Sequence, residues 1–267
     1  MPGVTHRLRL AGTTLITALA VLAAILTASP AQAAAAKYVA LGDSYSSGVG
    51  TREYLADDGC YRSRHAYPYK AAAEIGATLS FQACSGAKTA DVLSKQLGTL
   101  AADTDLVTIS IGGNDAGFSS VITQCAKPWP YTCTKEINAA NAFIRDTLPG
   151  RLNNVYDQIR AKAPNARVVV VGYPRLFNGE TCNALARISA GEQSSLNATA
   201  DLLATTTKAR ASAHGFSFVD PRDPFEGHQV CDDSEWVNGL SNPIVESYHP
   251  NRNGQTAYTG LVKPLLV

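Results

Sequence analysis

Two short runs of apolar residues, Leu106–Ile111 and Val168–Gly172, limit the folds that this chain can adopt. Both runs are rich in β-branched side chains and nearly free of polar ones, which is typical of parallel strands buried on both faces of a sheet. Three similar runs occur at Tyr38–Leu41, Leu79–Gln82 and Phe216–Val219. Together the five runs predict the strands of one buried parallel sheet.

Helical patterns separate these runs. We expect helices at Tyr67–Ile75, Ser189–Ala213 and Gly254–Val262. The pattern over Ile137–Arg160 is interrupted by Pro149-Gly150, so it predicts either one kinked helix or two helices. Strands that alternate with helices indicate an α/β fold, in which helices cover both faces of the sheet in a three-layer α/β/α sandwich.

The first 33 residues are typical of a secretory signal peptide. Arg7 and Arg9 precede an apolar stretch, and Ala31-Gln32-Ala33 is a small-residue cleavage site. The alternative, a membrane anchor, is less favourable because glycine and threonine residues interrupt the stretch. We therefore expect a secreted, extracellular protein without a stable membrane anchor, and a single domain over residues 34–267.

The charge balance excludes one class of partner. Once residues 1–33 are removed, the formal net charge falls from +1 to −1, because that segment holds two arginines and no acidic residue. A nearly neutral protein has no electrostatic attraction for nucleic acid or for anionic membranes. We expect no nucleic-acid partner, and a monomer is the default for an exported protein of this length.

An even number of cysteines in an exported chain indicates disulfides. Six cysteines allow 15 pairings, and the sequence does not choose among them. The simplest is sequential pairing. No C-x-x-C motif or Cys/His cluster occurs, so we expect no metal site. The six are Cys60, Cys84, Cys125, Cys133, Cys182 and Cys231.

Three connections are longer than a compact α/β fold needs: Gly112–Asn138, Pro174–Ile188 and Pro221–His249. They contain four of the six cysteines and both tryptophans. Long connections in a compact domain usually carry function. We expect these three to form the walls of a substrate cleft.

The polar residues after the first strand suggest a nucleophile. The strand ends at Gly42, and ligands of open α/β sheets bind just beyond the carboxyl ends of the strands. Ser44 is therefore the candidate nucleophile. Such a serine needs a base and donors that stabilise an oxyanion.

Three further places could supply those groups. Gly86 follows the second strand and can offer its backbone N–H, although a glycine here is more often a simple turn residue. Asn114 follows the third strand, where its amide can face an oxyanion or cap a helix. His249 precedes Pro250, which favours an extended backbone that suits a general base, although a lone histidine here is more often structural.

Four short sequence blocks around these residues resemble those of the GDSL, or SGNH, hydrolase family, both in their order along the chain and in their positions at strand ends. The resemblance covers essentially the whole mature chain and is greatest to secreted actinobacterial lipases, esterases and phospholipases. The blocks are Gly42-Asp43-Ser44, Gly86, Gly112-Gly113-Asn114-Asp115 and His249-Pro250.

The resemblance implies a flavodoxin-like five-stranded parallel sheet of order 2-1-3-4-5, sequential disulfides and no cofactor. It also implies the role of each site residue. Ser44 is the nucleophile and His249 the base. The Ser44 and Gly86 N–H groups and the Asn114 side chain form the oxyanion hole.

The chain departs from the family pattern at the residue that usually orients the catalytic histidine. The family usually places an aspartate three residues before the histidine, and here that position is Glu246. Glu246 could complete a triad. In some secreted actinobacterial relatives a backbone carbonyl orients the histidine instead, and here it would belong to Ser247. We favour this second arrangement, a Ser44–His249 dyad.

The family resemblance and the indicated secretion favour a lipase that releases fatty acids from acylglycerols. Phospholipase A1 activity and hydrolysis of short-chain or sugar esters are the alternatives, because the same set of catalytic residues can hydrolyse many kinds of ester. A nucleotide-binding protein is disfavoured because no phosphate-binding glycine motif follows a strand. A binding protein with an inactive site is disfavoured because all four catalytic positions are intact.

Overall fold

The computed structural model describes residues 34–128, 130–183, 185 and 187–267. Residues from Ala35 to Val267 form one compact unit. The segment predicted to be a signal peptide, residues 1–33, lies outside the described residues. Within the described part, no helix combines the length and the apolar character that a membrane crossing requires.

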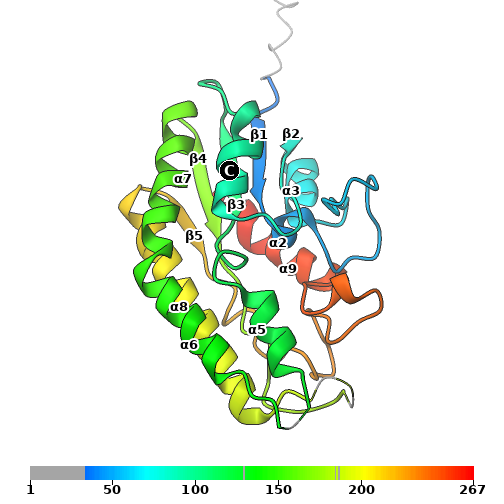
Figure 1. Ribbon diagram of the computed structural model, residues 1–267. Helices are drawn as coiled ribbons and strands as arrows, with labels where there is room; N and C mark the ends of the chain where they lie inside the picture. Colours follow the sequence, from blue (N-terminus) through cyan, green and yellow to red (C-terminus); the bar gives the residue numbers. More distant parts are fainter. Residues whose placement is uncertain (1–33, 129, 184, 186) are drawn as a thin grey trace, which may run out of the picture. The chain divides into compact units, whose positions relative to one another are not determined.

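The core of the fold is a five-stranded parallel sheet in the order β2-β1-β3-β4-β5 (Figure 1). Both the parallel sheet predicted from the apolar runs and the implied strand order are confirmed. The direction of winding reverses between β1 and β3, and in such sheets this reversal opens a crevice beyond the carboxyl ends of the two strands. The strands are β1 (Lys37–Gly42), β2 (Thr78–Phe81), β3 (Leu106–Ser110), β4 (Arg167–Val171) and β5 (Ser217–Val219).

Helices cover both faces of the sheet. Tyr38 and Ala40 of β1 belong to one core cluster with residues of α3 (Tyr67–Ile75) and α9 (Arg252–Val262). Val39 and Leu41 point to the opposite face, because side chains alternate along a strand. There they share a second cluster with α7 (Leu148–Lys162), η2 (Val92–Gln96), η3 (Leu97–Thr99) and part of α8 (Ala190–Ala213). This is the predicted three-layer sandwich.

The helix ends follow local sequence signals. α3 has the predicted bounds, and α8 begins one residue later than predicted because Ser189 caps it in a capping box with Glu192. α9 begins two residues earlier than predicted, since the Asn251 side chain accepts hydrogen bonds from the N–H groups of its first turn.

The interrupted pattern after Ile137 is two helices, α6 (Thr134–Asp146) and α7. Pro149 lies in the first turn of α7, where a missing N–H costs no helical hydrogen bond. The connection predicted at Gly112–Asn138 is shorter than expected, because it contains α5 (Phe118–Cys125) and the start of α6. α5 forms there because Val121, Ile122 and Cys125 can be buried along one side of a short helix.

The remaining short elements are α2 (Ser44–Ser47), α4 (Thr89–Asp91), η4 (Ile244–Glu246) and η5 (Lys263–Leu265).

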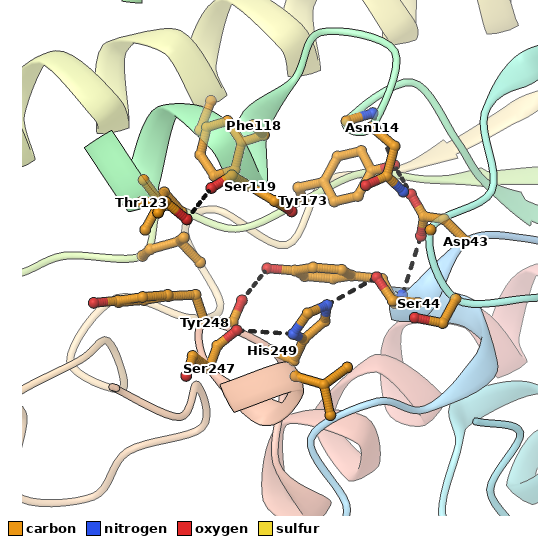
Figure 2. Close-up of a pocket in the computed structure, with 18 of the residues that line it drawn as sticks. Asp43, Ser44, Asn114, Phe118, Ser119, Thr123, Tyr173, Ser247, Tyr248 and His249 are labelled. Atoms are coloured by element: carbon orange, nitrogen blue, oxygen red, sulfur yellow. Dashed lines mark hydrogen bonds between the residues drawn. The ribbon is translucent and has the colours of Figure 1, made fainter. Parts of the chain in front are cut away.

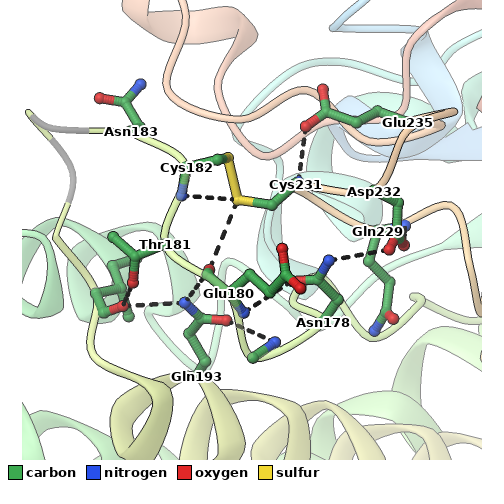
Figure 3. The surroundings of a disulfide bond; sticks show 12 residues. Asn178, Glu180, Thr181, Cys182, Asn183, Gln193, Gln229, Cys231, Asp232 and Glu235 are labelled. Atoms are coloured by element: carbon green, nitrogen blue, oxygen red, sulfur yellow. Dashed lines mark hydrogen bonds between the residues drawn. A yellow bond between two sulfur atoms is a disulfide. The ribbon is translucent and has the colours of Figure 1, made fainter.

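Three disulfides join the cysteines in sequence order: Cys60–Cys84, Cys125–Cys133 and Cys182–Cys231. The third links two of the long connections, and Figure 3 shows the polar side chains around it. Among the described residues, Cys125, Cys133 and Glu192 have the residue types of a metal site. Their two sulfur atoms are bonded to each other, so the cluster offers no thiolate ligand.

Candidate active site

A cavity of about 360 Å³ opens at the carboxyl ends of the central strands. Figure 2 shows its polar end, where side chains from the turns after β1, β3 and β4 approach the segment before α9. All four residues singled out from the sequence line it: Ser44, Gly86, Asn114 and His249. Segments that lie far apart in the chain are thus brought to one place.

The turn after β1 is shaped by a glycine. Gly42 has a φ of +122°, and a Cβ there would lie 2.4 Å from the Ser110 backbone oxygen of β3. Only glycine fits this conformation and this close approach. The next residue, Asp43, caps α2 by accepting a hydrogen bond of 3.0 Å from the Tyr45 N–H. Ser44 is the first residue of α2, and its side chain lines the cavity.

Both ring nitrogens of His249 have partners. Nε2 lies 2.8 Å from Ser44 Oγ, and Nδ1 lies 2.8 Å from the Ser247 carbonyl oxygen. A carbonyl only accepts hydrogen bonds, so Nδ1 carries the proton and Nε2 is left to accept the serine proton. Burial lowers the pKa of His249 to about 4, against the smaller opposing effect of the backbone carbonyls around it. The imidazole is therefore neutral at neutral pH, as a general base must be.

Glu246 faces away from this pair. Its buried carboxylate accepts a hydrogen bond from the Tyr54 hydroxyl and lies 4.0 Å from the Arg52 guanidinium. The residue that contacts His249 Nδ1 is Ser247, through its backbone carbonyl. The geometry thus corresponds to the dyad that we favoured from the sequence, with Glu246 fixing the loop after residue 50 to the histidine segment.

The expected oxyanion donors belong to three residues that line this cavity, Ser44, Gly86 and Asn114. Within the described part of the chain, the N–H groups of Ser44 and Gly86 donate to no other residue. Gly86 adopts a φ of +75° that favours glycine, with open space where a Cβ would project. The Asn114 amide donates one hydrogen bond, 3.1 Å long, to the Ala87 carbonyl and keeps a second proton. These three groups are therefore candidates for the oxyanion hole that we expected from the sequence.

Asp115 joins two of these turns, a role that could not be read from the sequence. Its buried carboxylate accepts hydrogen bonds from the Thr89 N–H at 2.9 Å and the Thr89 hydroxyl at 2.6 Å. Arg151 donates a third at 3.2 Å. The turn that carries Asn114 is therefore held against the turn that carries Gly86.

Sequence reasoning missed two aromatic residues of the site, Tyr45 and Tyr173. The Tyr45 hydroxyl donates to the Tyr248 carbonyl at 2.9 Å, and the Tyr173 hydroxyl donates to Asp43 Oδ2 at 2.6 Å. Burial raises the pKa of Asp43 to about 7. Position after a strand end, the signal that selected Ser44 and Asn114, would also have selected Tyr173, which follows β4.

The rest of the cavity is mostly apolar, with Ser119 and Thr123 of α5 as polar exceptions. Phe118, Ile122 and Ala126 follow one another along α5 and its C-terminal cap, while Ala200 and Leu203 line it from α8. The segment before His249 completes the wall with Leu240, Ile244, Val245 and Tyr248. All three connections that we expected to wall a cleft contribute residues. Among the described lining residues there is no lysine or arginine.

Comparison with known proteins places these features in a family. Residues 40–257 match the model of the GDSL-like lipase/acylhydrolase family. Among curated proteins, the chain is 48% identical over 259 residues to Lipase 1 of Streptomyces coelicolor, covering 94% of this chain and 96% of that protein. It is 45% identical over 242 residues to a lipase of Streptomyces rimosus, covering 90% of each.

Solved structures give the same result. The extracellular lipase of Streptomyces rimosus superposes with a TM-score of 0.82 at 44% identity, covering 86% of this chain and all of that one. A phospholipase A1 of Streptomyces albidoflavus superposes with a TM-score of 0.81 at 45% identity, covering 87% of this chain and 98% of that one. The two neighbours carry different activity names on nearly the same fold.

Proposed function

Because this chain belongs to the GDSL-like lipase/acylhydrolase family, we propose that it is a serine-dependent carboxylic-ester hydrolase of the lipase type, which releases fatty acids from acylglycerols. The observation that carries the proposal is the hydrogen bond of 2.8 Å between His249 Nε2 and Ser44 Oγ, at one end of a long apolar cavity.

In the first half of the reaction, Ser44 Oγ attacks the ester carbonyl carbon while His249 Nε2 takes the hydroxyl proton. The carbonyl oxygen becomes an oxyanion, which accepts hydrogen bonds from the Ser44 N–H, the Gly86 N–H and the Asn114 amide. His249 then gives the proton to the leaving alkoxide, so that the alcohol departs and the acyl group stays on Ser44.

In the second half, water attacks the acyl-enzyme, and His249 takes a proton from the water as it adds. The tetrahedral intermediate collapses, the fatty acid leaves, and the proton returns to Ser44. Throughout, the Ser247 carbonyl holds the ring by accepting from Nδ1 and favours the charged imidazolium that forms. Glu246 takes no part in these steps.

The apolar wall supports an acyl chain longer than acetyl. From Phe118 to Ala126 the wall along α5 extends about 12 Å at 1.5 Å per residue, a length that suits a medium acyl chain. Burying methylene groups there is favourable by about 0.8 kcal/mol each. This length disfavours the sugar-ester alternative, since an acetyl group would leave most of the wall uncovered.

Phospholipase A1 activity is the second candidate, and the structural likeness to the Streptomyces albidoflavus enzyme favours it. A phospholipid brings a phosphate to the site, and cationic side chains are the usual partners of phosphate. The absence of lysine and arginine from the described lining therefore makes an uncharged acylglycerol the better substrate.

The test is product analysis by mass spectrometry with the mature protein and its Ser44→Ala variant. Both receive triacylglycerol and a phosphatidylcholine whose two acyl chains differ. We expect fatty acid from triacylglycerol with the wild type alone. Release of a single chain from the phospholipid would identify the position attacked and establish the second candidate. Cleavage of short-chain esters only, with neither lipid touched, would contradict the lipase proposal.

We also propose that the protein acts outside the cell. Its three disulfides suit an oxidising compartment, and a neighbouring structure is named as an extracellular lipase. Measuring activity and mature mass in the culture medium, with and without residues 1–33, tests this proposal together with the predicted cleavage.

A further inference from the structure

The Tyr173 hydroxyl bridges two turns of the active site. It donates to Asp43 Oδ2 at 2.6 Å and accepts from the Gly113 N–H at 3.3 Å. Asp43 immediately precedes Ser44, and Gly113 immediately precedes Asn114. One oxygen atom thus connects the turn that carries the proposed nucleophile to the turn that carries the proposed amide donor.

The tyrosine ring reinforces this bridge. It packs edge-on against Tyr45, with ring centroids 5.0 Å apart, and Tyr45 in turn donates to the Tyr248 carbonyl beside His249. The ring also lies against Gly113, since a Cβ on that residue would be 3.4 Å from Tyr173 Cζ. In Figure 2 Tyr173 lies between Asn114 and Phe118.

This connection matters because an oxyanion hole tolerates little displacement. Donors must lie about 2.7–3.1 Å from the developing oxyanion, and a misplacement of about 1 Å can reduce the rate by roughly a hundredfold. Asp115 already fixes the Asn114 turn to the Gly86 turn. Ser110 at the end of β3 is hydrogen-bonded to the Asp43 N–H and to the Ser46 hydroxyl, and the Tyr173 bridge adds a direct link between Asp43 and Gly113, the residues that precede Ser44 and Asn114.

We propose that Tyr173 is a positioning residue, which sets the distance between the Asn114 donor and Ser44 through its hydrogen bonds to Gly113 and Asp43. This inference rests on the proposed ester hydrolysis at the same site. Its competitor is a purely structural role, in which the hydroxyl only satisfies the buried Asp43 carboxyl. A structural role affects stability, whereas a positioning role affects the transition state.

The experiment compares Tyr173→Phe with Tyr258→Phe. The Tyr258 hydroxyl is also buried and donates to the Gly172 carbonyl at 2.9 Å, on the residue before Tyr173, but it does not line the cavity. Both variants lose one buried hydroxyl and should lower the thermal midpoint by a similar amount, about 2–4 °C. We measure kcat and KM on a soluble medium-chain ester and the thermal midpoint of each variant.

We expect Tyr173→Phe to lower kcat by roughly 10- to 100-fold while KM changes by less than about threefold, because the lost contact acts on the transition state. Tyr258→Phe should keep kcat within about twofold. Equal kcat values for the two variants, or a rise in KM at unchanged kcat, would overturn the proposal.

A double-mutant cycle with Asn114→Ala identifies the route of the effect. If Tyr173 acts by placing the Asn114 amide, its removal should cost less than about threefold once that amide is absent, since coupled residues are not additive. Full additivity of the two losses would contradict the proposal. If Tyr173→Phe does not fold, Tyr173→Met fills the space with a flexible apolar chain, and the same outcomes apply.

Failure of this inference is distinguishable from failure of the proposed function. If Ser44→Ala retained full activity, the assignment of the site itself would be wrong. If Ser44→Ala is inactive and Tyr173→Phe behaves like Tyr258→Phe, only the bridge is wrong.

Discussion

The two ends of the cavity are built by different kinds of interaction. At the polar end the functional side chains are held by directional hydrogen bonds: His249 through both ring nitrogens, Asn114 through Ala87. At the apolar end, Phe118 and Ile122 are held by packing on α5, which the Cys125–Cys133 disulfide fastens at its last residue.

This difference indicates which property of the reaction each end of the cavity controls. A hydrogen bond weakens steeply with distance and angle, so a small change at the polar end should alter the rate for every ester. Packing responds to volume, so a change at the apolar end should alter which ester is preferred while the chemistry survives. Three predictions test this division, in order of decreasing effect.

The largest effect should come from the histidine, and its acidic neighbour provides the contrast. We expect His249→Ala to lower kcat by at least about 10⁴-fold, the scale of a lost catalytic base. Glu246→Ala should retain most activity, because its carboxylate contacts Tyr54 and Arg52 rather than the histidine. The measurement is kcat on one soluble ester. A loss of kcat on the order of a hundredfold in Glu246→Ala would contradict the dyad and support a triad that includes Glu246.

At the apolar end, Ala200→Phe should shift chain-length preference. Ala200 is buried on α8 and lines the cavity beside the next turn of the helix, which carries Leu203. A larger side chain fills space that longer acyl chains would occupy. We expect kcat/KM for long esters to fall by roughly tenfold relative to short esters. One methylene group that no longer fits an apolar pocket changes the transition-state free energy by about 1–3 kcal/mol.

A series of esters of increasing chain length measures this ratio. Ala198→Phe is the matched control, since Ala198 lies on the same helix and does not line this cavity. A uniform loss across all chain lengths would show that Ala200 supports the catalytic end instead.

The smallest effect concerns pH. Burial lowers the pKa of His249 to about 4, so the base stays neutral until the pH falls below that value. We expect kcat/KM to change little between pH 6 and 5 and to fall about tenfold per unit below pH 4. Asp43, whose pKa burial raises to about 7, remains protonated throughout this range and does not contribute.

Recovery of activity on return to pH 7 controls for acid unfolding. If kcat/KM instead fell near pH 6.5, the ordinary pKa of histidine, water would reach His249 more freely than its burial indicates.

The sequence determined much of this protein by itself. The apolar runs identify the strands, and Tyr67–Ile75 has the predicted helix bounds. Ser44, Gly86 and Asn114 could be selected because strand ends in a parallel sheet converge on one edge, and His249 because it precedes Pro250. These are local signals, carried by neighbouring residues. The helix α5 was missed because it is short and lies among loop-forming residues.

Only the tertiary structure decided the contacts between distant segments. Ser44 and His249 are 205 positions apart, and Asp43 and Tyr173 are 130 apart. No local pattern states that Glu246 turns toward Tyr54 or that one tyrosine oxygen bridges two turns. Directional hydrogen bonds depend on tenths of an ångström, and that precision arises only when the packed sheet and its helices bring the segments together.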